Sequence, residues 1–458
     1  MPAIDTLIID SVPGETRVCA IKRDRLYGFT LDRPEQRSRI DQIFCARVLT
    51  VDDRLAAAFV DLGNGSSGYL PVKDIVHGKV REGDGFILQV TRDAAEDKSV
   101  KVTTRVTVGG FYLVLTAHSP GLRFSRKINK TDRARLQHSL EPAISPQHGC
   151  IVRSNAQSAT PEAIAGEYQG LLSRWQQFKD TCKTASAPKL LFVPPVPAMA
   201  QVRDYFSPDL KRIVCNDAGQ LNDIRQMIAA FDSPHQPELI LSGMASDGVD
   251  RDALNDQIDS IMSDHVTLPS GGSVIFSETP ALVAIDVNSA SDNRGPRATN
   301  LEAAAEIARQ TRLRHLGGQI IIDFITMKKA KDRDDVETAL KKAFRPDPLK
   351  TFFAGFSNLG LYEMTRKRAG KSIHELLSTD RAEIPFSMRT KAINALRDVL
   401  INARARPGAP YRIDAGDDVI DALQNRLKPL LQETEALLGA PLLWPGKDTL
   451  TAKDKDHE

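Results

Sequence analysis

Short apolar runs separated by turn residues fill the first quarter of the chain. Three runs, at residues 7–9, 18–21 and 26–29, with turn signals such as Pro13-Gly14 between them, predict a β-meander. Five further runs with glycine-rich connections lie at residues 43–51, 56–61, 68–70, 85–91 and 100–104. Five short strands joined by tight turns predict a small closed barrel of the OB type.

The pattern changes to mixed helices and strands in the middle of the chain. Thr160-Pro161 places a capping hydroxyl and a helix-starting proline before a helix that should run towards Cys182. Apolar runs predict strands at residues 190–193, 213–215, 239–241, 273–276 and 281–287. These segments predict an α/β organisation.

The last third of the chain contains the clearest helix signal. Asn300 can cap this helix, apolar residues repeat behind it at helical spacing, and Gly317 can close it before a strand at residues 319–325. Residues 378–445 predict helices around a short strand.

Composition limits the possible functions. The 458 residues predict about three domains, and 61 basic against 59 acidic side chains leave a net charge of only +2. Nucleic-acid binding would therefore need local patches, of which residues 121–135 form the strongest basic one. No run of eighteen apolar residues and no leader-like N-terminus are present, so a cytoplasmic protein is expected. The five cysteines include no C-x-x-C pair and are expected to be scattered reduced thiols.

Two aspartates are the strongest candidates for chemistry. Asp286 and Asp323 each interrupt an apolar strand near its C-terminal end, where a buried carboxylate would be costly without compensation. If the helix between the strands makes a βαβ unit, both acids meet at one sheet edge and suit Mg²⁺, with Asn288 able to orient a water. The alternative is that Asp286 begins a turn and Asp323 caps a loop.

Aromatic and basic residues suggest an RNA surface. Phe59 and Tyr69 flank a glycine-rich turn of the predicted barrel and could stack on bases, with Lys98 and Lys101 for phosphates. From the residues alone, a core position is the favoured interpretation of Phe59. The run Arg366-Lys367-Arg368 could line a phosphate channel or form a solvated helix face.

Several strings together identify a family. They are AAFVD at 57–61, GYLP at 68–71, LPSGG at 268–272, AIDVNS at 284–289, NLEAA at 300–304 and EMTRKR at 363–368. From about residue 5 to residue 370 the chain resembles the ribonuclease E/G family, in a short form similar to ribonuclease G.

The resemblance implies an α/β multidomain fold. An RNase H-like subdomain would comprise residues 1–37 and 199–264, interrupted by an S1-type OB barrel at 38–118 and a 5′-sensor region at 119–198. A DNase I-like catalytic subdomain at 265–370, a small C-terminal α/β domain at 371–446 and a disordered tail at 447–458 would follow.

The resemblance also implies a function. The expected activity is that of a Mg²⁺-dependent endoribonuclease that cuts single-stranded RNA to 5′-phosphate and 3′-hydroxyl ends, in rRNA processing or mRNA decay. Asp286 and Asp323 would hold the Mg²⁺ and Asn288 would assist. Phe59, Tyr69 and Lys98 would bind RNA, as would Arg366, Lys367 and Arg368, while Arg153 and Ser154 would bind a 5′-monophosphate. The rival hypotheses are an RNA-binding protein with weakened catalysis and a DNA-directed nuclease.

The chain departs from the family pattern at two places. Leu122-Arg123 replaces a glycine pair beside the 5′-sensor, which brings the preference for 5′-monophosphate ends into question. No cysteine occurs at residues 369–381, where the family carries its zinc-link C-x-x-C, so a homodimer is expected to rest on direct protein contacts without zinc. No membrane segment and no scaffold tail for partner enzymes are expected.

Overall fold

A computed structural model describes residues 4–63, 65–76, 79–94, 99–125, 128–145, 147–231, 233, 235–242, 250–378, 387–406 and 410–444. The chain forms two compact units. The first comprises residues 1–5, 37–212 and 222–238, and the second comprises residues 6–36, 213–221 and 239–458. Among the described helices, none combines the length and apolarity needed to cross a membrane.

The first unit contains the predicted barrel. Its strands are β4 (Ile43–Asp52), β5 (Ala57–Asp61), β6 (Ser67–Pro71), β7 (Gly85–Arg92) and β8 (Val100–Thr103). They follow the order β4-β5-β6-β8-β7, and pairing between β4 and β7 closes the barrel. Alternate side chains such as Val48, Val60 and Leu88 fill its interior. The prediction of a closed five-stranded barrel consistent with an OB-type fold is therefore confirmed.

A second sheet and several helices complete the first unit. The sheet has the order β11-β12-β10-β9, built from β9 (Thr107–Gly109), β10 (Leu113–Thr116), β11 (Leu122–Phe124) and β12 (Gly149–Val152). The helices are α1 (Lys130–Leu140), α2 (Pro161–Thr184) and α3 (Pro197–Tyr205). The Thr160 hydroxyl accepts the Ala163 N–H at 3.2 Å, so the predicted cap of α2 is confirmed.

One prediction about the cysteines is wrong. Cys45 and Cys182 form a disulfide, whereas Cys19, Cys150 and Cys215 are free and buried. The reason is tertiary: strand β13 (Lys189–Phe192) pairs with β4 and brings the end of α2 beside Cys45, although 137 residues separate the two cysteines.

The second unit contains the predicted meander in a five-stranded sheet of order β15-β14-β1-β2-β3. Its strands are β1 (Thr6–Val12), β2 (Glu15–Lys22), β3 (Arg25–Asp32), β14 (Arg212–Cys215) and β15 (Glu238–Leu241). In the sequence, helix α4 (Ala218–Ala229) follows β14 and passes into the first unit at residue 222, and α5 (Arg251–Met262) follows β15. The barrel strands lie in the sequence between β3 and β14.

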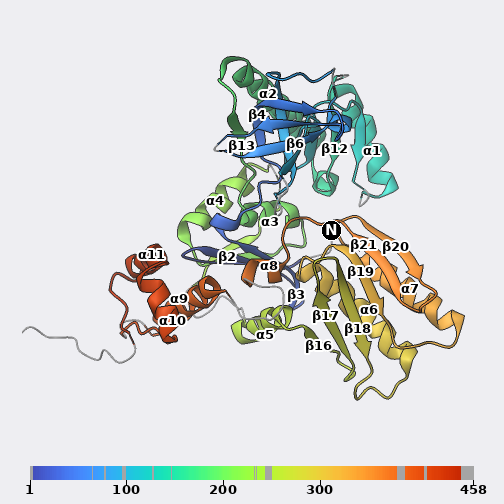
Figure 1. The fold of residues 1–458 in the computed structure, drawn as a ribbon, viewed down its shortest axis with the longest axis vertical. Coiled ribbons are helices and arrows are strands. Elements are labelled where there is room, and N and C mark those ends of the chain that lie inside the picture. The colour runs from blue at the N-terminus through green and yellow to red at the C-terminus, as the bar shows by residue number, and fades with distance from the viewer. Residues whose placement is uncertain are drawn as a thin grey trace, which may run out of the picture. The chain divides into compact units, whose positions relative to one another are not determined.

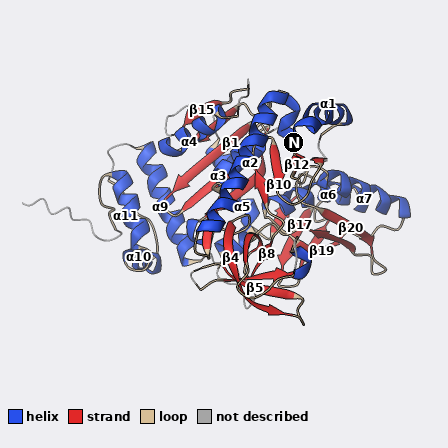
Figure 2. Ribbon diagram, turned by 90° about the horizontal axis from the view of Figure 1, so that it is seen from above, coloured by secondary structure: helices blue, strands red, loops and turns tan. Residues whose placement is uncertain are grey.

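A six-stranded sheet, here called the acid-bearing sheet, forms the largest part of the second unit. Its order is β16-β17-β18-β19-β21-β20. The strands are β16 (His265–Thr267), β17 (Ser273–Glu278), β18 (Leu282–Asn288), β19 (Gly318–Asp323), β20 (Thr351–Phe356) and β21 (Tyr362–Arg366). Helices α6 (Pro296–Leu313) and α7 (Ala330–Phe344) lie together on one face of it (Figures 1 and 2).

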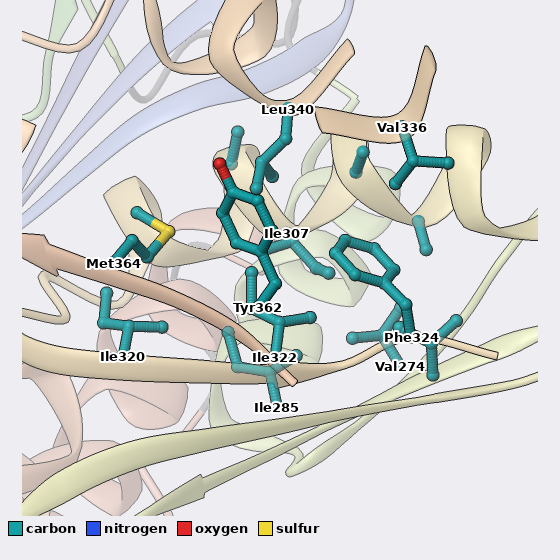
Figure 3. Packing of buried hydrophobic residues seen from close by; sticks show 14 of the residues in the cluster. Val274, Ile285, Ile307, Ile320, Ile322, Phe324, Val336, Leu340, Tyr362 and Met364 are labelled. Atoms are coloured by element: carbon teal, nitrogen blue, oxygen red, sulfur yellow. The ribbon is translucent and has the colours of Figure 1, made fainter. Parts of the chain in front are cut away.

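The core of the acid-bearing sheet lies between the strands and these two helices. Ile320 and Ile322 of β19, with Tyr362 and Met364 of β21, point towards Leu340 of α7 (Figure 3). Because side chains alternate along a strand, the intervening residues face away from the helices. We call that second side the open face.

Helix α6 starts earlier than predicted. Gly295, in the left-handed region at φ 92°, precedes Pro296 at the first helical position, so the cap is not Asn300. Asn300 is instead fully buried inside the helix. The helix ends at Leu313, and His315 at φ 57° turns the chain before Gly317 is reached.

The C-terminal region is helical where the structure describes it. It contains α8 (Ile373–Leu377), α9 (Met388–Ala405), α10 (Asp417–Gln424) and α11 (Lys428–Leu438). The expected short strand is reduced to one isolated β-bridge between Arg412 and Leu443. The whole of the expected disordered tail, residues 447–458, and the end of the cysteine-free segment lie outside the described residues.

Candidate active site

The two candidate aspartates lie side by side at the end of the acid-bearing sheet. Strands β18 and β19 are parallel neighbours, and Asp286 is the register partner of Asp323. The prediction of a βαβ unit that brings the two acids to one sheet edge is thus confirmed. Neighbouring strands are about 4.8 Å apart, which is close enough for the two carboxylates to share one cation.

The acids are exposed, in contrast to the expectation of carboxylates inside a core. Ile285 and Val287 of β18 point into the core, whereas Asp286 and Asn288 between and after them lie on the open face. Asp323 is likewise exposed beyond buried Ile322. Alternation along the strands therefore avoids the cost of a buried charge and leaves the oxygens accessible to solvent and substrate.

Asn288 belongs to the same cluster. Its Nδ2 donates to Asp286 Oδ2 at 2.8 Å, which fixes one carboxylate oxygen and leaves the amide oxygen of Asn288 turned away from that bond. Across the described residues, no group of three or more His, Cys, Asp or Glu side chains is placed to hold a metal. The groups available to bind a cation here are the carboxylates of Asp286 and Asp323 and the side-chain amide of Asn288. Such hard oxygen ligands, with positions left for water and phosphate, fit Mg²⁺.

The loop after Asn288 is held by an ionic cluster that sequence reasoning missed. Asp292 accepts hydrogen bonds from Arg294 at 2.9 Å and from the Thr299 hydroxyl at 2.8 Å. These bonds from Arg294 hold the pKa of Asp292 well below its usual range. Arg294 also pairs with Glu302, whose carboxylate accepts the Ser270 N–H. An acid two residues before an arginine, just before a proline-started helix, was the available sequence signal.

Asn300 connects helix α6 to the segment after Asp323. Its Nδ2 donates to the Ile325 carbonyl at 2.8 Å, and its Oδ1 accepts the Ile325 N–H at 3.1 Å. The buried amide thereby satisfies both backbone groups of a residue two positions after the catalytic candidate. Sequence reasoning treated Asn300 as a cap and missed this role.

The barrel aromatics form a pair. Phe59 and Tyr69 are register partners on β5 and β6, and their ring centroids are 5.9 Å apart in an edge-to-face arrangement. Both are half-buried, and Phe59 lies outside the buried core of the barrel. Lys101, the register partner of Tyr69 on β8, forms an ion pair with Asp74 at 3.3 Å. Lys98 lies outside the described residues.

The 5′-sensor candidates lie in the first unit. Arg153 follows β12 and donates to Asp204 Oδ1 at 2.5 Å. Ser154 begins a short 3₁₀ segment and lines a pocket of about 340 Å³ together with residues such as Phe111 and Phe206. Arg123 donates to the Thr116 hydroxyl at 3.1 Å. A phosphate at Arg153 would therefore share the guanidinium with Asp204.

The basic run 366–368 divides between the two faces of the acid-bearing sheet. Arg366 is buried and donates to both oxygens of Asp347, at 3.0 and 3.1 Å, so it is not an RNA contact. Arg368 donates to the Gly317 carbonyl at 3.2 Å and packs on that turn. Lys367 is exposed. The run begins at Arg366, the last residue of β21, and Lys367 and Arg368 follow the strand, so the three cations do not form a helix face.

The closed barrel of the first unit and the acid pair on the open sheet face of the second make this a mixed α/β protein of several domains. The family model described as the ribonuclease E/G family matches residues 107–369. The chain is 33% identical to ribonuclease E of Escherichia coli strain K12, over 79% of this chain and 36% of that protein. It is 31% identical to ribonuclease E of Haemophilus influenzae, over 79% and 41% respectively.

Ribonuclease G of Haemophilus influenzae is 28% identical and matches over 96% of both chains. The chain belongs to the ribonuclease E/G family. It spans about two fifths of the length of the two ribonuclease E relatives.

Proposed function

We propose that this protein is a Mg²⁺-dependent endoribonuclease that cuts single-stranded RNA and leaves 5′-phosphate and 3′-hydroxyl ends. The observation that carries the proposal is the register pairing of Asp286 with Asp323, beside Asn288, on an exposed sheet face. Membership in the ribonuclease E/G family supports it.

The chain's own residues would perform three tasks. Asp286 and Asp323 would hold the cation, and Asn288 would orient Asp286 and a nearby water. When bound, Mg²⁺ would neutralise phosphodiester charge and lower the pKa of water. The Asp292–Arg294 cluster and the Asn300–Ile325 bonds would keep the two strand ends in place, because small displacements of reacting groups cost rate.

RNA binding would involve the barrel. The half-exposed rings of Phe59 and Tyr69 would stack on bases, and Lys101, the register partner of Tyr69, would contact phosphate. The resemblance assigns the same role to Lys98. Arg153 and Ser154 would receive a 5′-monophosphate, with Asp204 holding the guanidinium in place. The acid-bearing sheet would correspond to a DNase I-like catalytic subdomain, and rRNA processing or mRNA decay would be the setting.

The test is cleavage of a fluorescent single-stranded RNA with Mg²⁺ and then with excess EDTA. We expect cutting only with Mg²⁺, and Asp286→Asn should abolish it. Asp334→Asn removes an exposed acid of α7 and serves as the matched control, with unchanged cutting. RNA that is retained but not cut by the parent protein would favour the RNA-binding alternative, and equal cutting of matched DNA would favour a less selective nuclease.

A further inference from the structure

The open face of the acid-bearing sheet carries one prominent exposed aromatic residue. Phe352 of β20 is 63% exposed. Its neighbour Phe353 packs against the core beneath α7, so Phe352 points to the opposite side of the sheet. The core packing of Phe353 shows that the strand is anchored, and the exposed ring is not needed for that anchoring.

Register pairing places Phe352 on the same face as the acid pair. Phe352 is the partner of Thr365 on β21, and Thr365 is the partner of Gln319 on β19. Gln319 lies four residues before Asp323 on the same strand, so both point to the open face. Four residues along β19 and two strand spacings across give a separation of about 16 Å between Phe352 and Asp323. A single-stranded RNA of a few nucleotides could cover that separation.

Two lysines lie beside the ring, at the end of the β20–β21 pair that points away from Asp323. Lys350 precedes Phe352 by two residues and Lys367 follows Thr365 by two, so both continue the open-face positions of their strands. The Lys367 N–H donates to the Lys350 carbonyl at 2.9 Å, which extends the β20–β21 pairing to this point. Both lysines are exposed.

The charges on this face favour a polyanion near the ring. Glu363, the partner of Ile321, is an exposed acid in the middle of the face. Phosphates would therefore lie over Lys350 and Lys367, whereas a base would lie on Phe352. An aromatic ring beside cations is an arrangement by which proteins hold single-stranded nucleic acid without reading its sequence.

We propose that Phe352, with Lys350 and Lys367 beside it, is a base-stacking platform that holds single-stranded RNA a few nucleotides away from the scissile phosphate. The inference rests on the proposed function, because it uses the acid pair as the point of cleavage. The pairing of β19 with β21 and of β21 with β20 connects Phe352 to Asp323 on one face of the same sheet.

The main experiment measures RNA affinity by fluorescence anisotropy in EDTA, where no cutting occurs. Phe352→Ala should weaken binding of a 5′-hydroxyl single-stranded RNA by about 5- to 100-fold, and Phe352→Trp should retain it. Leu359→Ala is the matched control, since Leu359 is 86% exposed in the turn that joins β20 to β21, and its affinity should equal that of the parent. Equal affinity of Phe352→Ala and the parent would overturn the proposal.

Two further measurements separate stacking from other roles. With RNAs too short to extend from Asp323 to Phe352, the difference between parent and Phe352→Ala should vanish. Lys350→Ala and Lys367→Ala should each reduce the slope of log affinity against log salt by about 0.7. If Phe352→Ala instead lowers the native mass of the protein and leaves RNA affinity unchanged, the face binds a second copy of the chain and the proposal is wrong.

Failure of this inference can be told apart from failure of the proposed function. A parent protein that does not cut RNA with Mg²⁺ contradicts the endoribonuclease assignment, whatever Phe352 does. A parent that cuts RNA, together with a Phe352→Ala variant that binds and cuts equally well, contradicts only the stacking platform.

Discussion

Two pairs of charged residues on the acid-bearing sheet have opposite surroundings. Asp286 and Asp323 lie on the open face, exposed, with Asn288 as a neighbour. Arg366 and Asp347 lie on the helix side, buried, with two hydrogen bonds between them and a third from Arg366 to the Leu316 carbonyl at 2.5 Å. The buried pair uses its hydrogen-bonding capacity inside the protein, whereas the exposed pair keeps oxygens available for a ligand.

The difference separates stability from activity. A buried ion pair is costly to break because the remaining charge has no partner. Two like charges at the surface contribute little to stability, so their removal should affect only what they bind. A substitution in the exposed pair should therefore reduce cleavage and leave stability unchanged. A substitution in the buried pair should reduce stability and leave cleavage by the folded protein unchanged.

The largest expected effect is on turnover. Asp323→Asn should reduce RNA cleavage at least about 10³-fold, because removal of one anionic ligand weakens the cation site on which the reaction depends. Its free energy of unfolding should equal that of the parent. Single-turnover cleavage and urea denaturation measure the two quantities, and a variant that cuts at the parent's rate would contradict the site assignment.

The next effect is on stability. Arg366→Met should lower the free energy of unfolding by about 3–5 kcal/mol, because Asp347 is left buried and unpaired. Protein that remains folded should cut RNA at close to the parent's rate. Arg345→Met, at an exposed arginine after α7, is the control and should change stability by less than about 0.5 kcal/mol. A fully stable, inactive Arg366→Met would show that Arg366 contacts RNA after all.

A substitution that connects the two regions should affect both quantities. Asn300→Ala leaves the Ile325 N–H and carbonyl without their side-chain partners, which should cost about 1–3 kcal/mol in stability. Turnover should fall about 100-fold through displacement of Asp323, with a smaller change in KM. Asn358→Ala, at an exposed asparagine, should match the parent. An Asn300→Ala effect confined to KM would place Asn300 outside the positioning of Asp323.

A smaller effect is expected from the barrel. Phe59→Ala should weaken single-stranded RNA binding about 10-fold, because one base loses its stacking partner. Phe59→Tyr keeps an aromatic ring and should bind the RNA as tightly as the parent. The unfolding midpoint should hardly change, since Phe59 lies outside the buried barrel core. A large loss of stability with no loss of RNA affinity would show that Phe59 is a core residue and not an RNA contact.

The smallest effect concerns pH. The bonds from Arg294 depress the pKa of Asp292, so the stabilisation from this carboxylate is present above its unfolded pKa of about 3.9. It is lost only as pH falls through the lower pKa of the folded state. The stability difference between Asp292→Asn and the parent should therefore be constant from pH 5 to pH 8 in urea titrations. A difference that changes within that range would show that the cluster is not formed.

The sequence predicted much of the local structure. The spacing of apolar residues and the turn residues act over a few positions. They predict the strands of the barrel, the capped helix at Thr160 and the βαβ unit around Asp286 and Asp323. The same information misplaced the start of α6, because Gly295-Pro296 and Asn300 both resemble helix starts and only packing shows that Asn300 is buried.

Sequence alone thus determined which segments become strands and helices and that two acids end neighbouring parallel strands. Only the tertiary structure decided that the acids face solvent, that Arg366 faces the core while Lys367 does not, and that Cys45 meets Cys182. The physical reason is the distance along the sequence over which each kind of interaction acts. Turn and helix signals act between close neighbours, whereas the buried face of a strand and the contacts of a cysteine are set by segments that pack against it from far along the chain.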